Sequence, residues 1–337
     1  MKKTKIPQKH LLHFFLLMSV LHLNTCQSQT TNNMSNKNVN PLLCNPEKGI
    51  CEIPTTPSLT DSNTTFKQQK PVKIIYFTDP ICSSCWGIEP QLRKLKLEYS
   101  HYIEIEYRMG GLLPDWSYNS GGISKPSDVA HHWDEVSLYY DMPIDGDIWL
   151  ENPLHSSYPP SIAFKAAQIQ DEEKAVHFLR KIREMVFLEK KNICQWEYLA
   201  QAATVCGLNI EKMKEDYKSK AKVLFEEDLA LARKMGVRGF PSLYVIDPSQ
   251  NQQLLYGFRA YQNFEETILK TYPEAKKMSY NTSWNHLFNK YQTLTAREFT
   301  ELSANPRKES EKILDNLTAN GTLQKYQTKN GAIWKIK

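Results

Sequence analysis

The pattern of apolar positions predicts an α/β core in the first half of the chain. The run VKIIYFT, residues 72–78, is rich in β-branched and aromatic residues and predicts a buried strand. In residues 83–99, Leu92 and Leu95 belong to an apolar series with approximately helical spacing. The next run, YIEIEYRM at 102–109, alternates apolar and polar positions as a half-buried strand does. Strand, helix and strand in this order predict a βαβ unit with a parallel strand pair.

A long helical stretch then interrupts this α/β pattern. From about residue 127 to 236 the periodicity is helical, and one predicted face carries Ala175, Phe178, Leu179, Ile182 and Val186. Strand patterns resume at 242–247 and 253–258, and a helix is predicted near 262–270. An all-helical insertion within an α/β domain over 71–272 is therefore expected.

The last part, 280–337, is predicted to be a small module of its own. Thr295 and Glu298 have the spacing of a capping box, which marks the start of a helix. Two strand patterns flank Asn330 and Gly331, a dipeptide typical of a tight hairpin. Helices followed by a hairpin are the order of a winged helix, and we expect the module to serve as a docking or dimer surface.

The first 26 residues read as an export signal. Four lysines before residue 10 precede the apolar stretch LLHFFLLMSVLHL, which is too short and too often interrupted by histidine for a membrane span. Leu23 stands three positions before Cys26, as in a loose lipoprotein signal, so 1–26 is predicted to be a signal peptide or lipoprotein signal with lipidation at Cys26. A disordered apolar tail on a cytoplasmic protein is the alternative.

A polar linker follows at 27–70 and contains two cysteines. Its Asn, Thr, Ser, Gln and Lys content cannot bury enough apolar surface to order itself. Within it, CNPEKGIC carries Cys44 and Cys51, which are candidates for a closed disulfide, a partial metal site or a second redox pair. Seven cysteines in all, three of them near the start, fit an oxidising compartment such as the cell envelope.

Charge and composition exclude little. The chain has 337 residues, is 41% hydrophobic and carries a formal net charge of +5, so it can bury a core and hold about two domains. The lysines of the first nine residues supply four of these charges, which leaves about +1 for the rest. Nothing in this balance indicates a nucleic-acid partner.

The candidate chemistry lies in FTDPICSSCWG, directly after the first strand. Cys82 and Cys85 are separated by two residues, so both sulfur atoms can meet on one helical turn. At a helix start, Cys82 would have a lowered pKa and be the attacking group, while Cys85 would resolve the mixed disulfide. A zinc site needs two further ligands, and Cys194 and Cys206 make a poor second pair; inert packing is the third reading.

Pro241 is the second feature, in GVRGFPSLYV. A proline is allowed at the first position of a strand, and X-Pro bonds tolerate cis geometry. A cis Pro241 near Cys82 would expose the backbone of Phe240 to an extended peptide, whereas an ordinary trans proline in a loop would have no such role.

Together these features resemble a known family. The cysteine pair on a strand-to-helix turn, the helical insertion and Phe240-Pro241 before a strand resemble the DsbA-type thiol-disulfide oxidoreductases of the thioredoxin superfamily. DPICSSCWG, SSYPPSIAFKAA and GVRGFPSLYV are similar to the branch of predicted protein-disulfide isomerases related to the adaptor that presents the Spx regulator to the ClpXP protease. The resemblance implies an α/β thioredoxin fold with a large helical insertion, plus the winged-helix-like module.

The resemblance also implies roles for single residues. Cys82 would be the nucleophile, Cys85 the resolving thiol and Pro241 the cis proline, with Phe240 and Trp86 in the substrate groove. The metal-free, cofactor-free reaction would exchange disulfides with cysteine-containing proteins and with a redox partner.

The sequence departs from the family pattern at the buried acid. Tyr76 stands six positions before Cys82, where many relatives carry a carboxylate that relays a proton. Asp79 and Asp228 are the candidates to replace it. Ser83 and Ser84 lack the imidazole of a histidine between the cysteines, which predicts a less oxidising dithiol. A non-catalytic adaptor that binds a client protein for a protease is the competing function.

Overall fold

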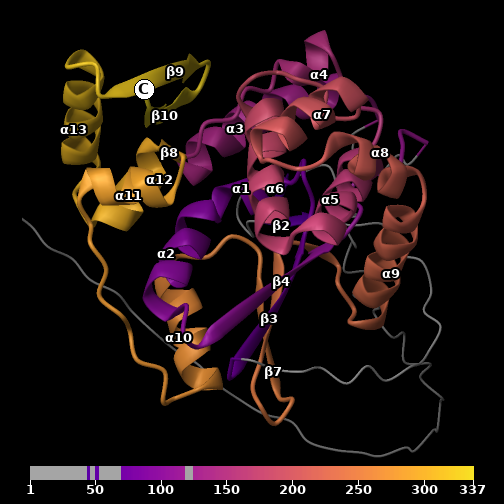
Figure 1. The fold of residues 1–337 in the computed structure, drawn as a ribbon, viewed down its shortest axis with the longest axis horizontal. Coiled ribbons are helices and arrows are strands. Elements are labelled where there is room, and N and C mark those ends of the chain that lie inside the picture. The colour runs from indigo at the N-terminus through magenta and orange to yellow at the C-terminus, as the bar shows by residue number, and fades with distance from the viewer. Residues whose placement is uncertain (1–43, 46–49, 53–69, 118–123) are drawn as a thin grey trace, which may run out of the picture. The chain divides into compact units, whose positions relative to one another are not determined.

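The computed structural model describes residues 44–45, 50–52, 70–117 and 124–337. The chain divides into two units, Met1–Lys37 and Asn38–Lys337. Only the second contains described residues, and Figure 1 shows its helices and strands. The predicted export signal and Cys26 lie outside the described residues.

Four of the described strands form the central sheet. They are β3 (Val72–Thr78), β4 (Ile103–Met109), β6 (Ser242–Ile246) and β7 (Gln252–Tyr256), in the order β4-β3-β6-β7. β3 and β4 are parallel, with Tyr76 opposite Tyr107, and β6 is antiparallel to both β3 and β7. The predicted βαβ unit is confirmed. Burial of nearly every β3 side chain explains why its sequence is apolar throughout.

The single helix predicted over 83–99 is instead two helices. α1 (Ser83–Gly87) ends at Ile88, and α2 (Glu89–Tyr99) begins with Pro90 in its first turn. Proline lacks an amide hydrogen, and its ring excludes the carbonyl four residues earlier, so one continuous helix cannot form. α10 (Tyr261–Thr271) packs with α2 and also contacts β6 and β7 (Figure 1).

Helices alone separate β4 from the short strand β5 (Gly239–Phe240) within the described residues. They are α3 (Ser127–Tyr140), α4 (Ile148–Glu151), α5 (Tyr158–Gln170), α6 (Glu172–Phe187), α7 (Trp196–Val205), α8 (Ile210–Lys218) and α9 (Lys220–Lys234). The predicted apolar face of α6 is buried from Ala175 to Val186. α9 lies against β4, and α5 contacts α6, α8 and α9. The insertion therefore shares its core with the central sheet.

The C-terminal module has a hydrophobic core of its own around Leu294, Phe299 and Trp334. Its elements are α11 (Trp284–Lys290), β8 (Thr293–Thr295), α12 (Ala296–Ser303), α13 (Arg307–Ala319), β9 (Leu323–Thr328) and β10 (Gly331–Ile336). The strands pair in the order β8-β10-β9. The Thr295 and Glu298 capping box and the hairpin are confirmed. The likeness to a winged helix stays a prediction.

Buried charges join this module to the α/β domain. Glu298 is fully buried and accepts two hydrogen bonds from Arg180 of α6, at 2.7 and 3.0 Å. Arg93 of α2 lies 3.2 Å from the same carboxylate. Because removing one partner from such a group leaves buried charge uncompensated, the module is held in a specific position.

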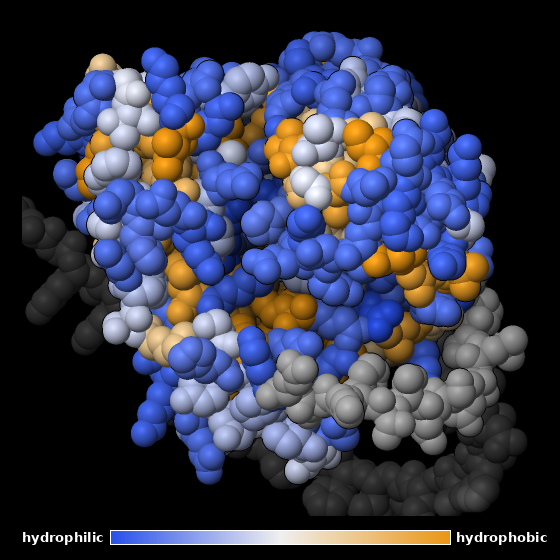
Figure 2. Space-filling model, in the orientation of Figure 1, coloured by the Kyte–Doolittle hydropathy of each residue, from blue (hydrophilic) through white to orange (hydrophobic). Residues whose placement is uncertain are grey.

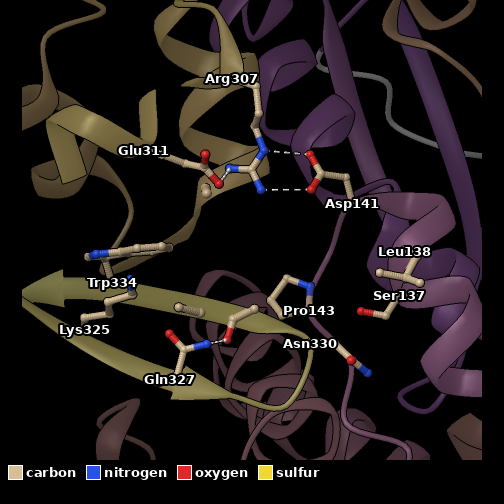
Figure 3. A pocket seen from close by; sticks show the side chains of 13 residues that line it. Ser137, Leu138, Asp141, Pro143, Arg307, Glu311, Lys325, Gln327, Asn330 and Trp334 are labelled. Carbon is tan, nitrogen blue, oxygen red and sulfur yellow. Dashed lines mark hydrogen bonds and ion pairs between the residues drawn. The ribbon is translucent and has the colours of Figure 1, made fainter. Parts of the chain in front are cut away.

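A second contact between the C-terminal module and the rest of the chain involves partly exposed side chains. Arg307 of α13 donates to both carboxylate oxygens of Asp141, each at 2.9 Å, and pairs with Glu311 at 3.3 Å (Figure 3). These residues line a polar cavity of about 270 Å³ between α3 and the β9 and β10 hairpin. Three of the charges that line it, those of Arg307, Asp141 and Glu311, are thus already paired with one another.

A third small sheet joins the linker cysteines to the domain. β1 (Cys44–Asn45), β2 (Ile50–Glu52) and β5 pair in the order β1-β2-β5. These three short strands are not predicted from the sequence. On the face shown in Figure 2, hydrophilic side chains separate limited hydrophobic areas. Over the described residues, the structure contains no helix with the length and apolarity of a membrane span.

Candidate active site

Cys82 lies at the point where the chain turns from β3 into α1. The turn is closed by a hydrogen bond from Cys82 N to Asp79 O at 3.3 Å. Cys82 is the N-cap residue of α1, and its sulfur accepts a hydrogen bond from Cys85 N at 3.1 Å. Both cysteines are present as thiols. The predicted meeting of Cys82 and Cys85 on one helical turn is confirmed.

The electrostatics of the pair differ from the prediction. Both cysteines are fully buried, and burial opposes the ionised form of each thiol. Burial and then the neighbouring Cys85 raise the pKa of Cys82 well above its usual range. For Cys85, burial is outweighed by a hydrogen bond from Cys82 and the charge of Arg183, so its pKa is lowered. The expectation of a lowered pKa at Cys82 is wrong for this conformation, because burial raises its pKa more than the hydrogen bond from Cys85 N lowers it.

Arg183 supplies the positive charge behind the cysteines. It comes from α6 in the helical insertion and is fully buried. Its Nη2 lies 2.5 Å from Thr78 Oγ1 and 3.2 Å from Asp79 O, and its Nη1 lies 2.6 Å from Glu89 Oε1. Its Nε finds no hydrogen-bond partner among the described residues. A buried guanidinium with one carboxylate partner therefore stabilises negative charge on the sulfur atoms.

Tyr76 lies in β3, six positions before Cys82, where the family resemblance predicts a buried acid. Its hydroxyl accepts a hydrogen bond from Thr78 Oγ1 at 3.0 Å. Burial, followed by the charge of Cys85, raises the pKa of Tyr76 well above its usual range, so the hydroxyl keeps its proton. Hydrogen bonding by Tyr76 is one of the effects that lower the pKa of Cys85. A chain of polar groups thus runs from Arg183 through Thr78 and Tyr76 to Cys85.

Asp79, a candidate proton relay, shapes the turn before Cys82. Its carboxylate accepts hydrogen bonds from Ile81 N at 3.0 Å and from Leu112 N and Ser157 Oγ at 2.8 Å each. Burial raises its pKa to about 6, although these three contacts oppose the change. The carboxyl can therefore change protonation near neutral pH, and it also ties the cysteine turn to the insertion.

Asp228, the other candidate, belongs to a separate buried ion cluster. Arg108 Nη1 lies 2.8 Å from one of its oxygens, and Met109 N and Lys165 Nζ lie 2.9 Å from the other. These contacts hold α9 against the end of β4. Because both oxygens are used by structural partners, the geometry favours a packing role over the predicted relay.

Pro241 has the predicted cis peptide bond, between Phe240 and Pro241. Ser242, the next residue, pairs with Phe77 of β3, so Pro241 lies beside the end of the strand that leads to Cys82. The Phe240 side chain is buried, and its ring lies so close to Gly110 that a Cβ there would meet it at 1.8 Å. Phe240 can therefore meet a peptide only through its backbone.

Trp86 does not lie in a substrate groove, and that prediction is corrected. The side chain is fully buried, donates from Nε1 to Pro143 O at 3.0 Å and stacks on Phe187. The Arg180 guanidinium lies 4.3 Å from the ring centroid. Trp86 thus anchors α1 to the helical insertion.

The other four cysteines among the described residues form two groups. Cys194 and Cys206 are both thiols, and Cys194 Sγ donates to Ser156 O at 2.9 Å. Cys44 and Cys51 are directly opposite one another in the β1 and β2 ladder. Within the described part of the chain, no His, Cys, Asp and Glu side chains gather in threes or more as a metal site requires.

Sequence reasoning missed Arg183, Thr78 and the strand that pairs with β5. The only signal for Arg183 is a charged residue next to Ile182, on the predicted buried face of its helix. Helical periodicity cannot show that α6 turns this residue toward β3, because that depends on how the insertion folds back.

Fold and site together define a thioredoxin-fold protein with a Cys-X-X-Cys pair and an adjacent cis proline. Residues 76–266 match the thioredoxin family. The ClpXP adapter protein SpxH of Halalkalibacterium halodurans is 33% identical over 87% of this chain and 96% of its own. The SpxH of Bacillus subtilis is 27% identical over 79% of this chain and 90% of its own.

One solved structure shows the same fold. A candidate protein disulfide isomerase from Nitrosomonas europaea aligns with a TM-score of 0.53 and 22% identity, over 61% of this chain and 98% of its own. The chain belongs to the thioredoxin family, in a branch that includes the SpxH adapters.

Proposed function

We propose that this protein is a thiol-disulfide oxidoreductase that acts on cysteine-containing proteins through Cys82 and Cys85. The observation that carries this proposal is the fully buried guanidinium of Arg183 behind the cysteine pair, whose charge acts to lower the pKa of both thiols. An inert pair needs no positive charge, and burying an arginine costs several kcal/mol. Its position is therefore best understood as support for a thiolate.

Reduction of a client disulfide follows from this arrangement. The hydrogen bond between the sulfur atoms lets Cys82 pass its proton to Cys85 and attack the client. The bond between Cys82 and one client sulfur forms, and the other client sulfur leaves and takes the proton from Cys85. The Cys85 thiolate, stabilised by Arg183 and Tyr76, then attacks Cys82 Sγ. The Cys82-Cys85 disulfide forms and the second client thiolate is released, to be protonated by solvent. Oxidation of a client is the reverse.

Substitution of each cysteine tests this function. Cys82→Ala should abolish insulin reduction, and Cys85→Ala should leave a long-lived mixed disulfide at Cys82 that mass spectrometry detects. Cys206→Ala, which removes a thiol outside the site, is the matched control and should keep full activity. Unchanged insulin reduction by Cys82→Ala would contradict the proposal.

The second candidate function is a non-catalytic adaptor that binds a client protein for a protease. The resemblance to SpxH proteins, whose names state a ClpXP adapter role, favours it. An adaptor should keep its client affinity when both cysteines are replaced by alanine. Client binding by the double variant, measured by calorimetry with purified protein, separates the two functions.

We further propose that the protein acts in the cell envelope, with Cys26 as a candidate lipid anchor. The basic start, the apolar stretch and the cysteine at residue 26 support this location. Intact mass spectrometry of protein from its native cell would show a new N-terminus and any acyl chain. An unprocessed Met1 or a chain starting at Lys2 would favour the cytoplasmic alternative.

A further inference from the structure

The edge of β5 is paired with a segment from the N-terminal part of the same chain. β2 runs antiparallel to β5, with Cys51 opposite Phe240 and Glu52 opposite Gly239. β5 immediately precedes Pro241, which lies beside the end of β3. An extended client would bind there by adding a strand through backbone hydrogen bonds. The segment at 50–52 therefore lies where a client peptide is expected.

The same strand also neighbours the helix that Cys82 caps. β2 contacts α1 as well as β5, so its backbone lies close to both the helix that Cys82 caps and the strand that precedes Pro241. Cys51 is the central residue of β2. Backbone placement alone thus brings a third cysteine to the edge of β5, near the helix that Cys82 caps.

A fourth cysteine lies one strand further away. In the β1 and β2 ladder, Cys44 is directly opposite Cys51, and β1 is on the side of β2 away from β5. Directly opposite residues of an antiparallel pair have Cβ atoms about 4.5–5.5 Å apart. A disulfide needs roughly 3.5–4.5 Å, so small adjustments close the bond. The register therefore suits a disulfide that opens and closes without rearranging the strands.

We propose that Cys44 and Cys51 form a second redox pair that exchanges electrons with Cys82 and Cys85 inside one molecule. This inference rests on the proposed function of the Cys82 pair. Cys51 is the residue that bonds to Cys82, because β2, which carries Cys51, pairs directly with β5. β1, which carries Cys44, is separated from β5 by β2. The N-terminal segment then occupies the edge of β5 as a client of the same molecule, and it must be displaced before another protein binds there.

The exchange balances without another reactant. The Cys82 thiolate attacks the Cys51 sulfur of a Cys44-Cys51 disulfide, so the bond between Cys51 and Cys82 forms as Cys44 leaves as a thiolate. Cys85 then attacks Cys82, the Cys82-Cys85 disulfide forms, and Cys51 leaves. Two electrons pass to the linker pair, and its two thiolates take up the protons released by Cys82 and Cys85. The reverse reaction oxidises Cys82 and Cys85.

Two full-chain variants, each with one linker cysteine and Cys82, test this pairing. Cys44→Ser with Cys85→Ser keeps Cys51, and Cys51→Ser with Cys85→Ser keeps Cys44 as its matched control. Both are equilibrated with reduced and oxidised glutathione, digested without reduction and analysed by mass spectrometry. We expect the Cys51-Cys82 disulfide to form with an effective concentration on the order of tenfold above that of Cys44-Cys82. Circular dichroism checks folding, and Cys85→Ala replaces Cys85→Ser if serine unfolds the chain.

The outcomes separate the two proposals. An equal or greater yield of Cys44-Cys82 overturns the assignment of Cys51, even when Cys82 still forms its mixed disulfide with glutathione and the proposed function stands. If Cys82 forms no disulfide with glutathione in either folded variant, the proposed function and the second redox pair both fail.

Discussion

The Nη2 atom of Arg183 lies 2.5 Å from the hydroxyl of Thr78, although 105 positions separate the two residues in the chain. Thr78 ends β3, and Arg183 lies in α6 of the insertion. This contact makes the insertion part of the site rather than a cover over it. The Thr78 hydroxyl accepts a hydrogen bond from the guanidinium and donates one to the Tyr76 hydroxyl, so it links Arg183 to Tyr76.

Arg183→Met should make the cysteine pair more reducing. Removing the charge raises the pKa of Cys85 and destabilises the thiolate of the reduced form. We expect alkylation near neutral pH to slow roughly tenfold, since a neighbouring opposite charge is worth about one pKa unit or more. The reduction potential, measured against glutathione, should fall by about 30 mV, the equivalent of a tenfold change in equilibrium.

Two further variants show whether this effect belongs to the charge of Arg183. Arg183→Lys should recover part of the potential, because the ammonium keeps the charge but loses the fork of donors. Arg233→Met removes an exposed arginine of the same insertion and should leave the potential unchanged. A folded Arg183→Met protein with the wild-type potential would contradict a positioning role.

The sequence predicted local features of this site well and its long-range contacts poorly. The positions of β3, Cys82 and Cys85 follow from a buried strand, two closely spaced cysteines and helix-start chemistry, all of which are local. Arg183 is different, because its role depends on the path of the insertion between β4 and β5. The same reason explains Trp86, whose exposure depends on α6 residues such as Phe187.

The pKa order of the cysteines shows a second limit of sequence reasoning. A helix start favours ionisation of Cys82, and the expected hydrogen bond from Cys85 N is present. Burial of Cys82 and its contact with Cys85 outweigh this effect and raise the pKa of Cys82. Burial is set by the packing of several segments around the turn, so no pattern within FTDPICSSCWG reveals it.

Tyr76→Phe should slow the resolution of mixed disulfides. The Tyr76 hydroxyl helps to lower the pKa of Cys85, so its loss leaves less thiolate to attack Cys82. We expect the mixed disulfide with glutathione to persist several-fold longer in stopped-flow or quenched-flow measurements. Tyr107→Phe is the matched control, because Tyr107 lies opposite Tyr76 on β4 while its hydroxyl contacts Lys96. Equal lifetimes in the two variants would show that the hydroxyl of Tyr76 has no part in the reaction.

Asp79 should make the stability of the fold depend on pH between about 4 and 6. Its pKa is raised from 3.8 to about 6 in the folded protein, so the folded state binds more protons than the unfolded state in this range. The stability due to the protonated carboxyl is complete below 3.8 and is lost as the pH rises through about 6. The change amounts to about 3 kcal/mol, from roughly two pKa units.

Urea unfolding at a series of pH values measures this effect. Asp79→Asn cannot titrate, so its free energy of unfolding should lack the decline seen in the wild type, although the lost acceptor lowers it by about 1–3 kcal/mol overall. Asp247→Asn replaces an exposed carboxylate whose pKa is lowered by hydrogen bonds from Asn251, and should retain the decline. Parallel pH curves for wild type and Asp79→Asn would contradict the prediction.

Glu298→Gln should weaken the attachment of the C-terminal module. The carboxylate is buried between Arg180 and Arg93, and an amide removes the negative charge that both guanidinium groups contact. Arg180 then keeps only its pair with Glu184, and Arg93 only its longer pair with Glu89. We expect a loss of about 3 kcal/mol in the free energy of unfolding, in urea titrations followed by tryptophan fluorescence. Glu309→Gln, at an exposed position in α13, should change it by less than about 1 kcal/mol. Equal losses in both variants would mean that the buried charges do not hold the module.

Gly110→Ala should disturb the backbone that precedes Pro241. A Cβ at residue 110 would lie 1.8 Å from the Phe240 ring, so the ring must move and β5 with it. Overpacking of this kind costs about 1–3 kcal/mol, which urea unfolding measures. Phe240→Leu removes the clashing ring atoms, so the double variant should be more stable than Gly110→Ala alone. If Phe240→Leu instead adds its own loss to that of Gly110→Ala, the ring is not what fixes the position of β5, and the cause of the destabilisation must lie in the backbone of residue 110.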